Sequence, residues 1–163
     1  MNSISELRRI LGSCRTIAVV GLSPQWHRPS FFAAKYMQAH GYRVIPVNPA
    51  AAEILGERSY PSVTAAAAAL AGQGQRIDMV DCFRKTGDIG PIADEAIAIG
   101  ARCLWQQIGV VNETSAAKAR AAGLATVLDR CVKIEHARLF GGLGWAGVNT
   151  GVISSRRPQQ LPY

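Results

Sequence analysis

The sequence predicts an α/β protein built on one mostly parallel sheet of five strands, doubly wound so that helices cover both of its faces. Short apolar runs rich in β-branched residues alternate with Ala-rich helical stretches along nearly the whole chain, and such alternation is typical of repeated strand–helix units. Each run is apolar through its middle, as expected of strands that are covered on both faces. Together these observations predict a Rossmann-like fold.

The predicted strands, in order, are residues 16–20, 43–47, 78–83, 103–106 and 126–129. An N-terminal helix over residues 3–13 is predicted to precede them and to pack at the sheet edge. Its apolar residues keep helical spacing; they are Ile4, Leu7, Ile10 and Leu11.

The helices between the strands are predicted from the residues that begin and end them. The first begins at Pro29, which suits a first helical turn, and ends at Gly41. The high Ala content of residues 63–71 predicts the second. The third and fourth have candidate N-caps and terminal glycines; these pairs are Asp88 with Gly100, and Asn112 with Gly123.

The chain of 163 residues has the length of a single domain, which we place at residues 1–140. Residues 141–163 are Gly-rich and then basic, and we expect them to form a tail. This tail is either loosely ordered or docked against a partner subunit, and Trp145 favours docking. A protein partner or a homodimer is therefore left open.

The net charge of +7 and the pI of about 9.7 indicate an anionic partner. The basic residues are scattered, with few aromatic residues among them, so nucleic acid is disfavoured. No apolar run approaches the length of a membrane span, and the N-terminus lacks the pattern of a secretory signal. We expect a cytoplasmic protein without a membrane partner.

The cysteines and histidines show no metal-binding pattern. The four cysteines are widely spaced and form no C-x-x-C pair, which disfavours both a zinc site and a dithiol redox site. No cluster of His, Cys and carboxylate residues has metal-ligand spacing. We therefore predict reduced thiols and no bound metal.

The loop between the first strand and the first helix has the composition of a phosphate-binding loop. Gly21 permits a tight turn, Ser23 and Ser30 can donate hydroxyls, and Arg28 can form a charged fork. The N-terminus of the following helix adds free N–H groups and the positive end of the helix dipole. An ordinary β–α turn is the alternative, but a cation such as Arg28 at a helix N-terminus favours a bound anion.

Two features argue against NAD as the ligand. The G-x-G-x-x-G fingerprint is absent, since Gly21 is followed by Ser23 and no third glycine opens the helix. The second strand ends in Val47, Asn48 and Pro49, where an NAD-binding protein carries an acidic residue for the ribose.

Several motifs together resemble the stand-alone CoA-binding domain family over residues 16–138. They are Gly21-Leu22-Ser23, Arg28-Pro29-Ser30, Ile45-Pro46-Val47-Asn48-Pro49, Gly56, Tyr60-Pro61-Ser62 and the run from Asp129 to His136. The family is similar to the CoA-binding domain of the succinyl-CoA synthetase alpha subunit. The resemblance implies a Rossmann-type fold with coenzyme A as ligand. It implies no ligase activity, because the synthetase carries its phosphorylated histidine in a further domain.

The resemblance also implies a set of ligand-binding residues, all of them after the carboxyl ends of strands. The CoA phosphates would contact Gly21, Ser23, Arg28, Pro29 and Ser30. The nucleotide ribose would lie at Asn48 and Pro49, the 3′-phosphate near Phe83, Arg84 and Lys85, and the pantetheine arm along Gln107, Ile108 and Gly109.

The sequence therefore favours a non-catalytic protein that binds CoA or acyl-CoA as a carrier, sensor or regulatory module. One alternative is a small NADP-dependent oxidoreductase, in which Arg84 and Lys85 accept the 2′-phosphate. The other is a thiol-dependent hydrolase that uses Cys131 and His136. The basic residues on either side of Cys131, Arg130 and Lys133, would favour its thiolate. A shielded cysteine is the competing interpretation, and we favour it.

Overall fold

The computed structural model describes residues 1–140. The predicted tail, 141–163, with Trp145, lies outside the described residues. The strands of the main sheet are β1 (Thr16–Val20), β2 (Arg43–Val47), β5 (Met79–Cys82), β6 (Cys103–Gln106) and β7 (Ala125–Val127). The helices are α1 (Ile4–Ser13), α2 (Pro29–Ala39), α3 (Val63–Ala71), α4 (Ile89–Ala98), α5 (Glu113–Ala121) and α6 (Val132–Phe140).

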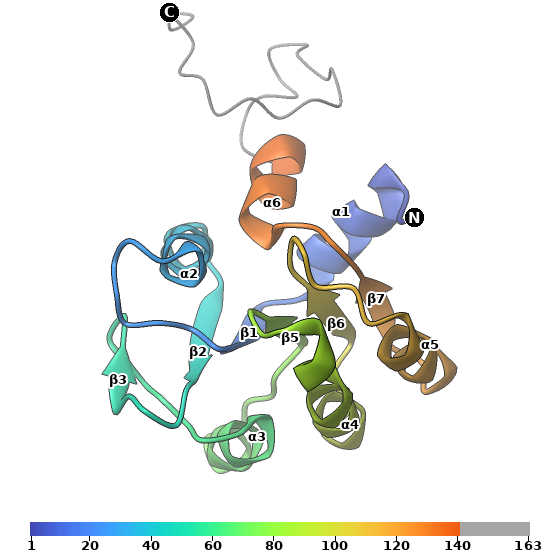
Figure 1. The fold of residues 1–163 in the computed structure, drawn as a ribbon. Helices are drawn as coiled ribbons and strands as arrows, with labels where there is room; N and C mark the ends of the chain where they lie inside the picture. Colours follow the sequence, from blue (N-terminus) through green and yellow to red (C-terminus); the bar gives the residue numbers. More distant parts are fainter. Residues whose placement is uncertain (141–163) are drawn as a thin grey trace, which may run out of the picture.

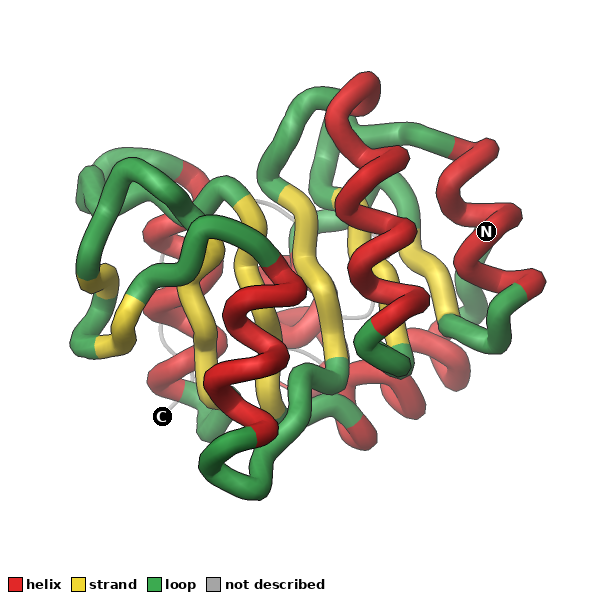
Figure 2. Tube along the Cα trace, turned by 90° about the horizontal axis from the view of Figure 1, so that it is seen from below, coloured by secondary structure: helices red, strands yellow, loops and turns green. Residues whose placement is uncertain are grey.

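The main sheet has the order β2-β1-β5-β6-β7, and all of its neighbouring strands are parallel. Helices α3, α4 and α5 cover one face, and α1, α2 and α6 cover the other (Figures 1 and 2). Alternate residues of each strand enter the two cores. In β1, Ala18 and Val20 face α3 and α4, whereas Ile17 and Val19 face α1 and α2. The predicted doubly wound α/β fold is confirmed.

Local sequence signals set most of the helix ends as predicted. Ser3 caps α1 by accepting from the Glu6 N–H, and Asn112 caps α5 by accepting from the Ser115 N–H. Pro29 is the first residue of α2. Asp88 is at the N-cap position of α4, but its side chain makes no capping bond. It pairs instead with Arg84.

Three elements were not predicted. A short hairpin, β3 (Glu53–Ile54) and β4 (Glu57–Arg58), lies beyond β2, and its turn uses Leu55 and Gly56 at positive φ. A 3-10 turn, η1 (Thr86–Asp88), precedes α4. The third is α6, which follows β7 and packs against α1 and α2. In addition, two predicted strands are shorter than expected, because the structure ends β5 before Phe83 and β7 before Asp129.

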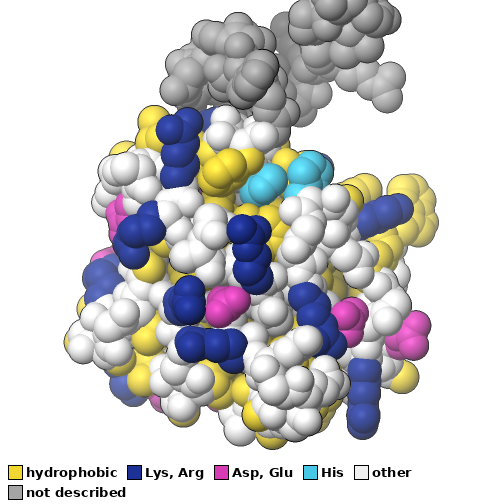
Figure 3. Space-filling view, turned by 180° about the vertical axis from the view of Figure 1, so that it is seen from behind, with side chains coloured by type: hydrophobic (Ala, Val, Ile, Leu, Met, Phe, Trp, Pro, Cys, Tyr) yellow, Lys and Arg dark blue, Asp and Glu magenta, His cyan; other side chains and the backbone are white. Residues whose placement is uncertain are grey.

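On the face seen in Figure 3, Lys and Arg side chains lie scattered among neutral ones rather than in one continuous stripe. Within residues 1–140, none of the helices combines the length and the apolar character that crossing a bilayer would take.

Candidate functional site

The strand order creates a hollow at the carboxyl end of the sheet. The chain leaves β1, forms β2 on one side of it, and later returns to form β5 on the other side. The loops after β1 and β5 therefore diverge, which is the position where open α/β sheets bind ligands. The loop after β1 holds Gly21, and the loop after β5 holds Phe83 and Arg84.

Two adjoining clefts occupy this end. The first, which we call the large cleft, has a volume of about 900 Å³. Its lining comes from the loops after β1, β5 and β6 together with Cys131, and consists of Gly21, Ser23, Gln25, Arg28, Pro29, Ser30, Phe83, Arg84, Lys85, Gln107, Ile108, Val110 and Cys131. Ten of the predicted ligand-binding residues are therefore brought together in one cleft.

The second, the small cleft, has a volume of about 460 Å³ and shares Gly21, Ser23 and Arg84 with the large cleft. Asn48 and Pro49, after β2, line it. The Asn48 amide already links two loops, because its Nδ2 donates to the Leu22 carbonyl at 2.9 Å and its Oδ1 accepts from the Ala50 N–H at 2.9 Å. Asn48 thus shapes the wall between β1 and β2.

A close approach of two backbones fixes the base of both clefts. Gly21 has a φ of +83°, and a Cβ added there would lie 2.4 Å from the Phe83 carbonyl oxygen and 3.0 Å from Cδ of Arg84. Only glycine combines this left-handed conformation with so small a separation. The β1 loop and the β5 loop are therefore held against each other at Gly21.

The loop after β1 is folded by its own serines. The Ser30 hydroxyl accepts from the Ser23 N–H at 3.0 Å, and the Ser23 hydroxyl accepts from the Gln25 N–H at 3.1 Å. No side chain caps the N-terminus of α2, where Arg28 occupies the N-cap position. This helix end therefore keeps its positive dipole directed at the large cleft.

Three cationic side chains line the large cleft: Arg28, Arg84 and Lys85. Within residues 1–140, Arg84 pairs with Asp88 at 3.4 Å, but no carboxylate pairs with Arg28 or Lys85. The Arg28 Nε donates to Oε1 of Gln25 at 3.2 Å, which holds the guanidinium over the loop. The arrangement suits a ligand with several phosphate groups.

A buried carboxyl lies next to Gln107, one of the residues that line the large cleft. Asp81, on β5, is 1% exposed, and its Oδ1 accepts from Nε2 of Gln107 at 2.5 Å. Burial raises the pKa of Asp81 to about 7, against the lowering effect of the Gln107 hydrogen bond. The sequence analysis did not single out Asp81 as a site residue. The signal that could have singled it out is a carboxylate inside an apolar strand, because a buried carboxylate must find a polar partner.

The thiol-based alternative is not supported by the geometry. Cys131 lines the large cleft, but burial raises its pKa, more than Lys133 lowers it. Lys133 does favour the thiolate, as expected of a basic neighbour, but burial outweighs it, which agrees with the favoured interpretation of a shielded cysteine. His136 is not paired with Cys131: its Nδ1 lies 3.0 Å from the Tyr36 hydroxyl, in an aromatic cluster between α2 and α6.

His40 and Gly109 make hydrogen bonds within the fold and line neither cleft. His40 is the C-cap residue of α2, and its ring bonds the Tyr36 carbonyl at 2.7 Å. Gly109 has a φ of +80°, and its N–H donates to Oδ1 of Asp129 at 2.7 Å. Among residues 1–140, no three His, Cys, Asp or Glu side chains come together as metal ligands.

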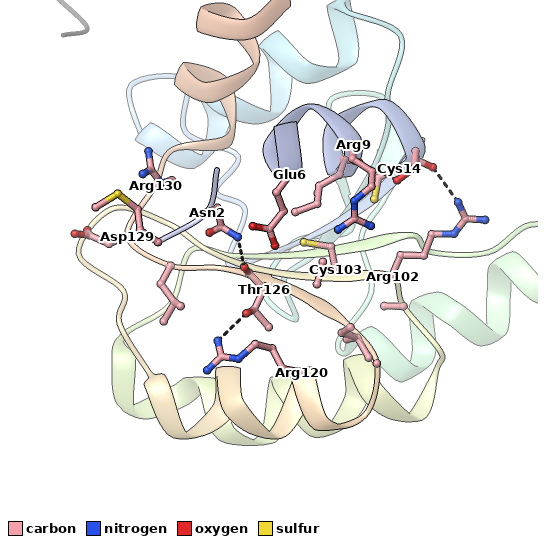
Figure 4. Close-up of a pocket in the computed structure, with 18 of the residues that line it drawn as sticks. Asn2, Glu6, Arg9, Cys14, Arg102, Cys103, Arg120, Thr126, Asp129 and Arg130 are labelled. Carbon is pink, nitrogen blue, oxygen red and sulfur yellow. Dashed lines mark hydrogen bonds between the residues drawn. The ribbon is translucent and has the colours of Figure 1, made fainter. Parts of the chain in front are cut away.

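A third hollow, of about 1250 Å³, runs along the edge strand β7 between α1 and α5 (Figure 4). Its polar groups largely bond one another. Asn2 donates to the Thr126 carbonyl, Arg120 to the Thr126 hydroxyl, and Arg102 to the Ser13 carbonyl. Asn2 thereby covers part of the exposed sheet edge. This hollow is larger than the large cleft, but none of the predicted ligand-binding residues line it.

Comparison with known proteins finds a family model and relatives that match most of the chain. A family model described as CoA binding domain matches residues 15–137. The uncharacterized protein YneT of Bacillus subtilis (strain 168) is 36% identical over 135 residues, which cover 83% of this chain and 95% of YneT.

Solved structures show the same fold. A hypothetical protein from Pyrococcus horikoshii OT3 is 37% identical, with a TM-score of 0.78 over 86% of this chain and 94% of that one. The dinucleotide-forming acetyl-coenzyme A synthetase 1 of Ca. Korarchaeum cryptofilum, in its apo form, is 20% identical, with a TM-score of 0.58. This chain corresponds to 27% of the synthetase and shares its fold over 74% of its own length.

Proposed function

Because the chain belongs to the family of the CoA binding domain, we propose that it binds coenzyme A or an acyl-CoA across the large and small clefts. One observation carries the proposal: Arg28, Arg84 and Lys85 line the same cleft as the uncapped N-terminus of α2. CoA is a nucleotide with a diphosphate and a 3′-phosphate, so its charge matches three cations and a helix dipole.

The parts of the ligand are assigned to the loops as the family resemblance implies. The diphosphate lies over Gly21, Ser23 and Ser30 at the N-terminus of α2, beside Arg28. The 3′-phosphate lies near Arg84 and Lys85. Arg84 lines both clefts, and Lys85 lines the large cleft.

The remaining residues accommodate the sugar and the arm. Asn48 and Pro49 line the small cleft next to the ribose. The pantetheine arm extends along Gln107, Ile108 and the adjoining Gly109 toward Cys131. The side chain of Ile108 is 62% exposed, so an apolar side wall is available for the arm.

We further propose that the protein acts without catalysis, as a carrier, sensor or regulatory module that presents CoA to a protein partner or to a second copy. The domain resembles that of the succinyl-CoA synthetase alpha subunit, whose catalytic histidine belongs to another domain. A cytoplasmic location accords with four cysteines that are all free in the structure.

Charge reversal at Arg28 tests the proposal. Arg28→Glu places a carboxylate beside the diphosphate, and the loss of a charged hydrogen bond should weaken CoA binding by about 1.5–3 kcal/mol, or at least tenfold. The matched control is Lys35→Glu, which makes the same charge change at an exposed position on the same helix. Equal effects of the two substitutions would show that Arg28 responds only to overall charge and would place the phosphates elsewhere.

A further inference from the structure

We propose that Asp81 is a positioning residue that acts through Gln107. Its carboxylate holds Nε2 of Gln107 toward the protein interior and thereby presents Oε1 to the large cleft, as an acceptor for an amide N–H of a pantetheine arm. The inference rests on the proposed function, because it names the part of the ligand that this side chain recognises.

The two side chains form a buried pair below the cleft. Asp81 is 1% exposed and Gln107 is 4% exposed, and the distance from Oδ1 to Nε2 is 2.5 Å. Asp81 lies on β5, and Gln107 follows β6, the next strand of the sheet. The pair therefore joins the loop that lines the cleft to the rigid centre of the sheet.

The chemistry of the pair fixes which end of the amide faces inward. An ionised carboxylate accepts hydrogen bonds and cannot donate them. Only the NH2 group of Gln107 can then face Asp81, and the carbonyl oxygen must point away. A glutamine without such a partner can turn its amide by about 180° at little cost.

The other end of the amide is open to the cleft. Within the described part of the chain, no hydrogen bond reaches Oε1 of Gln107, and no buried side-chain oxygen or nitrogen lacks a partner. Oε1 is therefore accessible to solvent, and Gln107 lines the large cleft. The structure offers a ligand one oriented acceptor at this point.

The preceding residue shows what a purely structural glutamine does here. Gln106 is fully buried, its Oε1 accepts from the Asn112 N–H at 2.6 Å, and its Nε2 donates to the Asn112 carbonyl at 3.1 Å. Both ends of its amide are used within the protein, as buried polar groups usually are. Gln107 has one end engaged and one end free, which is the arrangement of a binding group.

The pantetheine arm supplies the matching donor. It is the part of CoA that contains two secondary amides, each with one N–H, whereas adenosine 3′,5′-bisphosphate contains the adenosine, the 3′-phosphate and one of the two 5′-phosphates of CoA, and no amide of this kind. Asp81 should therefore matter for CoA and leave the bisphosphate unaffected. Burial of the Asp81 carboxyl, which raises its pKa to about 7, makes this residue costly for the fold, so a role in the cleft accounts for its presence.

The test compares the two ligands by isothermal titration at about pH 8, where Asp81 is ionised. Asp81→Leu has similar size and no acceptor, and we expect it to weaken CoA binding about three- to tenfold, the value of one neutral hydrogen bond, with no change for the bisphosphate. Asp81→Asn can still accept from Nε2 of Gln107 in one of its two amide orientations. We expect its loss of CoA-binding free energy to be about half that of Asp81→Leu. Asp94→Asn, at an exposed pair with Lys118, is the control.

A double-mutant cycle separates positioning from general support of the fold. Gln107→Leu should weaken CoA binding as much as Asp81→Leu does, and the double variant should lose no more than either single one. Additive losses, or equal losses for CoA and the bisphosphate, would overturn the inference. Wild-type protein that binds the bisphosphate but gains nothing from the arm would also overturn it, whereas failure to bind either ligand would overturn the proposed function itself.

Discussion

Replacement of Gly21 by alanine tests how the site is built into the fold. The added Cβ would lie 2.4 Å from the Phe83 carbonyl oxygen, on backbone that cannot rotate away, and the φ of +83° is itself unfavourable for alanine. The conformational cost is about 1–2 kcal/mol, and overpacking adds about 1–3 kcal/mol. We therefore expect Gly21→Ala to lower the free energy of unfolding by about 2–5 kcal/mol.

The matched control separates these two costs. Gly41 has a φ of +90° but nothing within 4 Å of an added Cβ, so Gly41→Ala should lose only the conformational part, about 1–2 kcal/mol. Urea unfolding followed by circular dichroism measures both variants. Because relief of the contact must move the β1 loop away from the β5 loop, Gly21→Ala should also weaken CoA binding, and Gly41→Ala should not. Equal stability losses in the two variants would refute the close approach at Gly21.

Three further predictions concern titratable groups. The pKa of Asp81 is about 7 in the folded protein, against an ordinary value of 3.8. Between these two pH values the folded state therefore binds a proton that the unfolded state has released. The free energy of unfolding should fall by up to about 4 kcal/mol as the pH rises through this window. Asp81→Leu should remove this dependence, and an unchanged pH profile would contradict the burial argument. Burial and His40 lower the pKa of His136, so stability should instead fall with acidification below about pH 6.5, and His136→Gln should flatten that decline in urea titrations. Burial raises the pKa of Cys131, so at neutral pH iodoacetamide should alkylate Cys131 more slowly than it alkylates the thiol of free glutathione. A faster rate for Cys131, measured by mass spectrometry, would support the thiol-dependent hydrolase instead.

Much of the fold could be predicted because the relevant signals are local. The strands of an α/β protein with helices on both faces of its sheet are apolar through their middles, and α3 and α5 begin and end where composition and capping residues predict. The hairpin of β3 and β4 was missed because each strand has only two residues, too few for a periodic pattern. Helix α6 was missed because its buried residues include Glu135 and His136, which do not read as an apolar stripe.

The loops that line the site could be predicted from the sequence, but the buried side-chain interactions beneath them could not. The loops after β1, β5 and β6 were expected to meet because parallel strands place their carboxyl ends at one edge, and ten predicted residues line the large cleft. The interaction of Asp81 with Gln107 joins residues 26 positions apart, and their burial depends on tertiary packing. Burial also sets the direction of the Cys131 pKa shift, because it outweighs the lowering by Lys133, and the extent of this burial could not be predicted from the neighbouring residues.

Isothermal titration of the wild-type protein with CoA, adenosine 3′,5′-bisphosphate, NAD, NADP and ATP at one fixed salt concentration tests the central claim most directly. The account predicts that CoA binds most tightly, that the bisphosphate retains a part of this affinity through Arg28, Arg84 and Lys85, and that NAD and ATP bind weakly. Tighter binding of NADP than of CoA, or no binding of CoA, would contradict it.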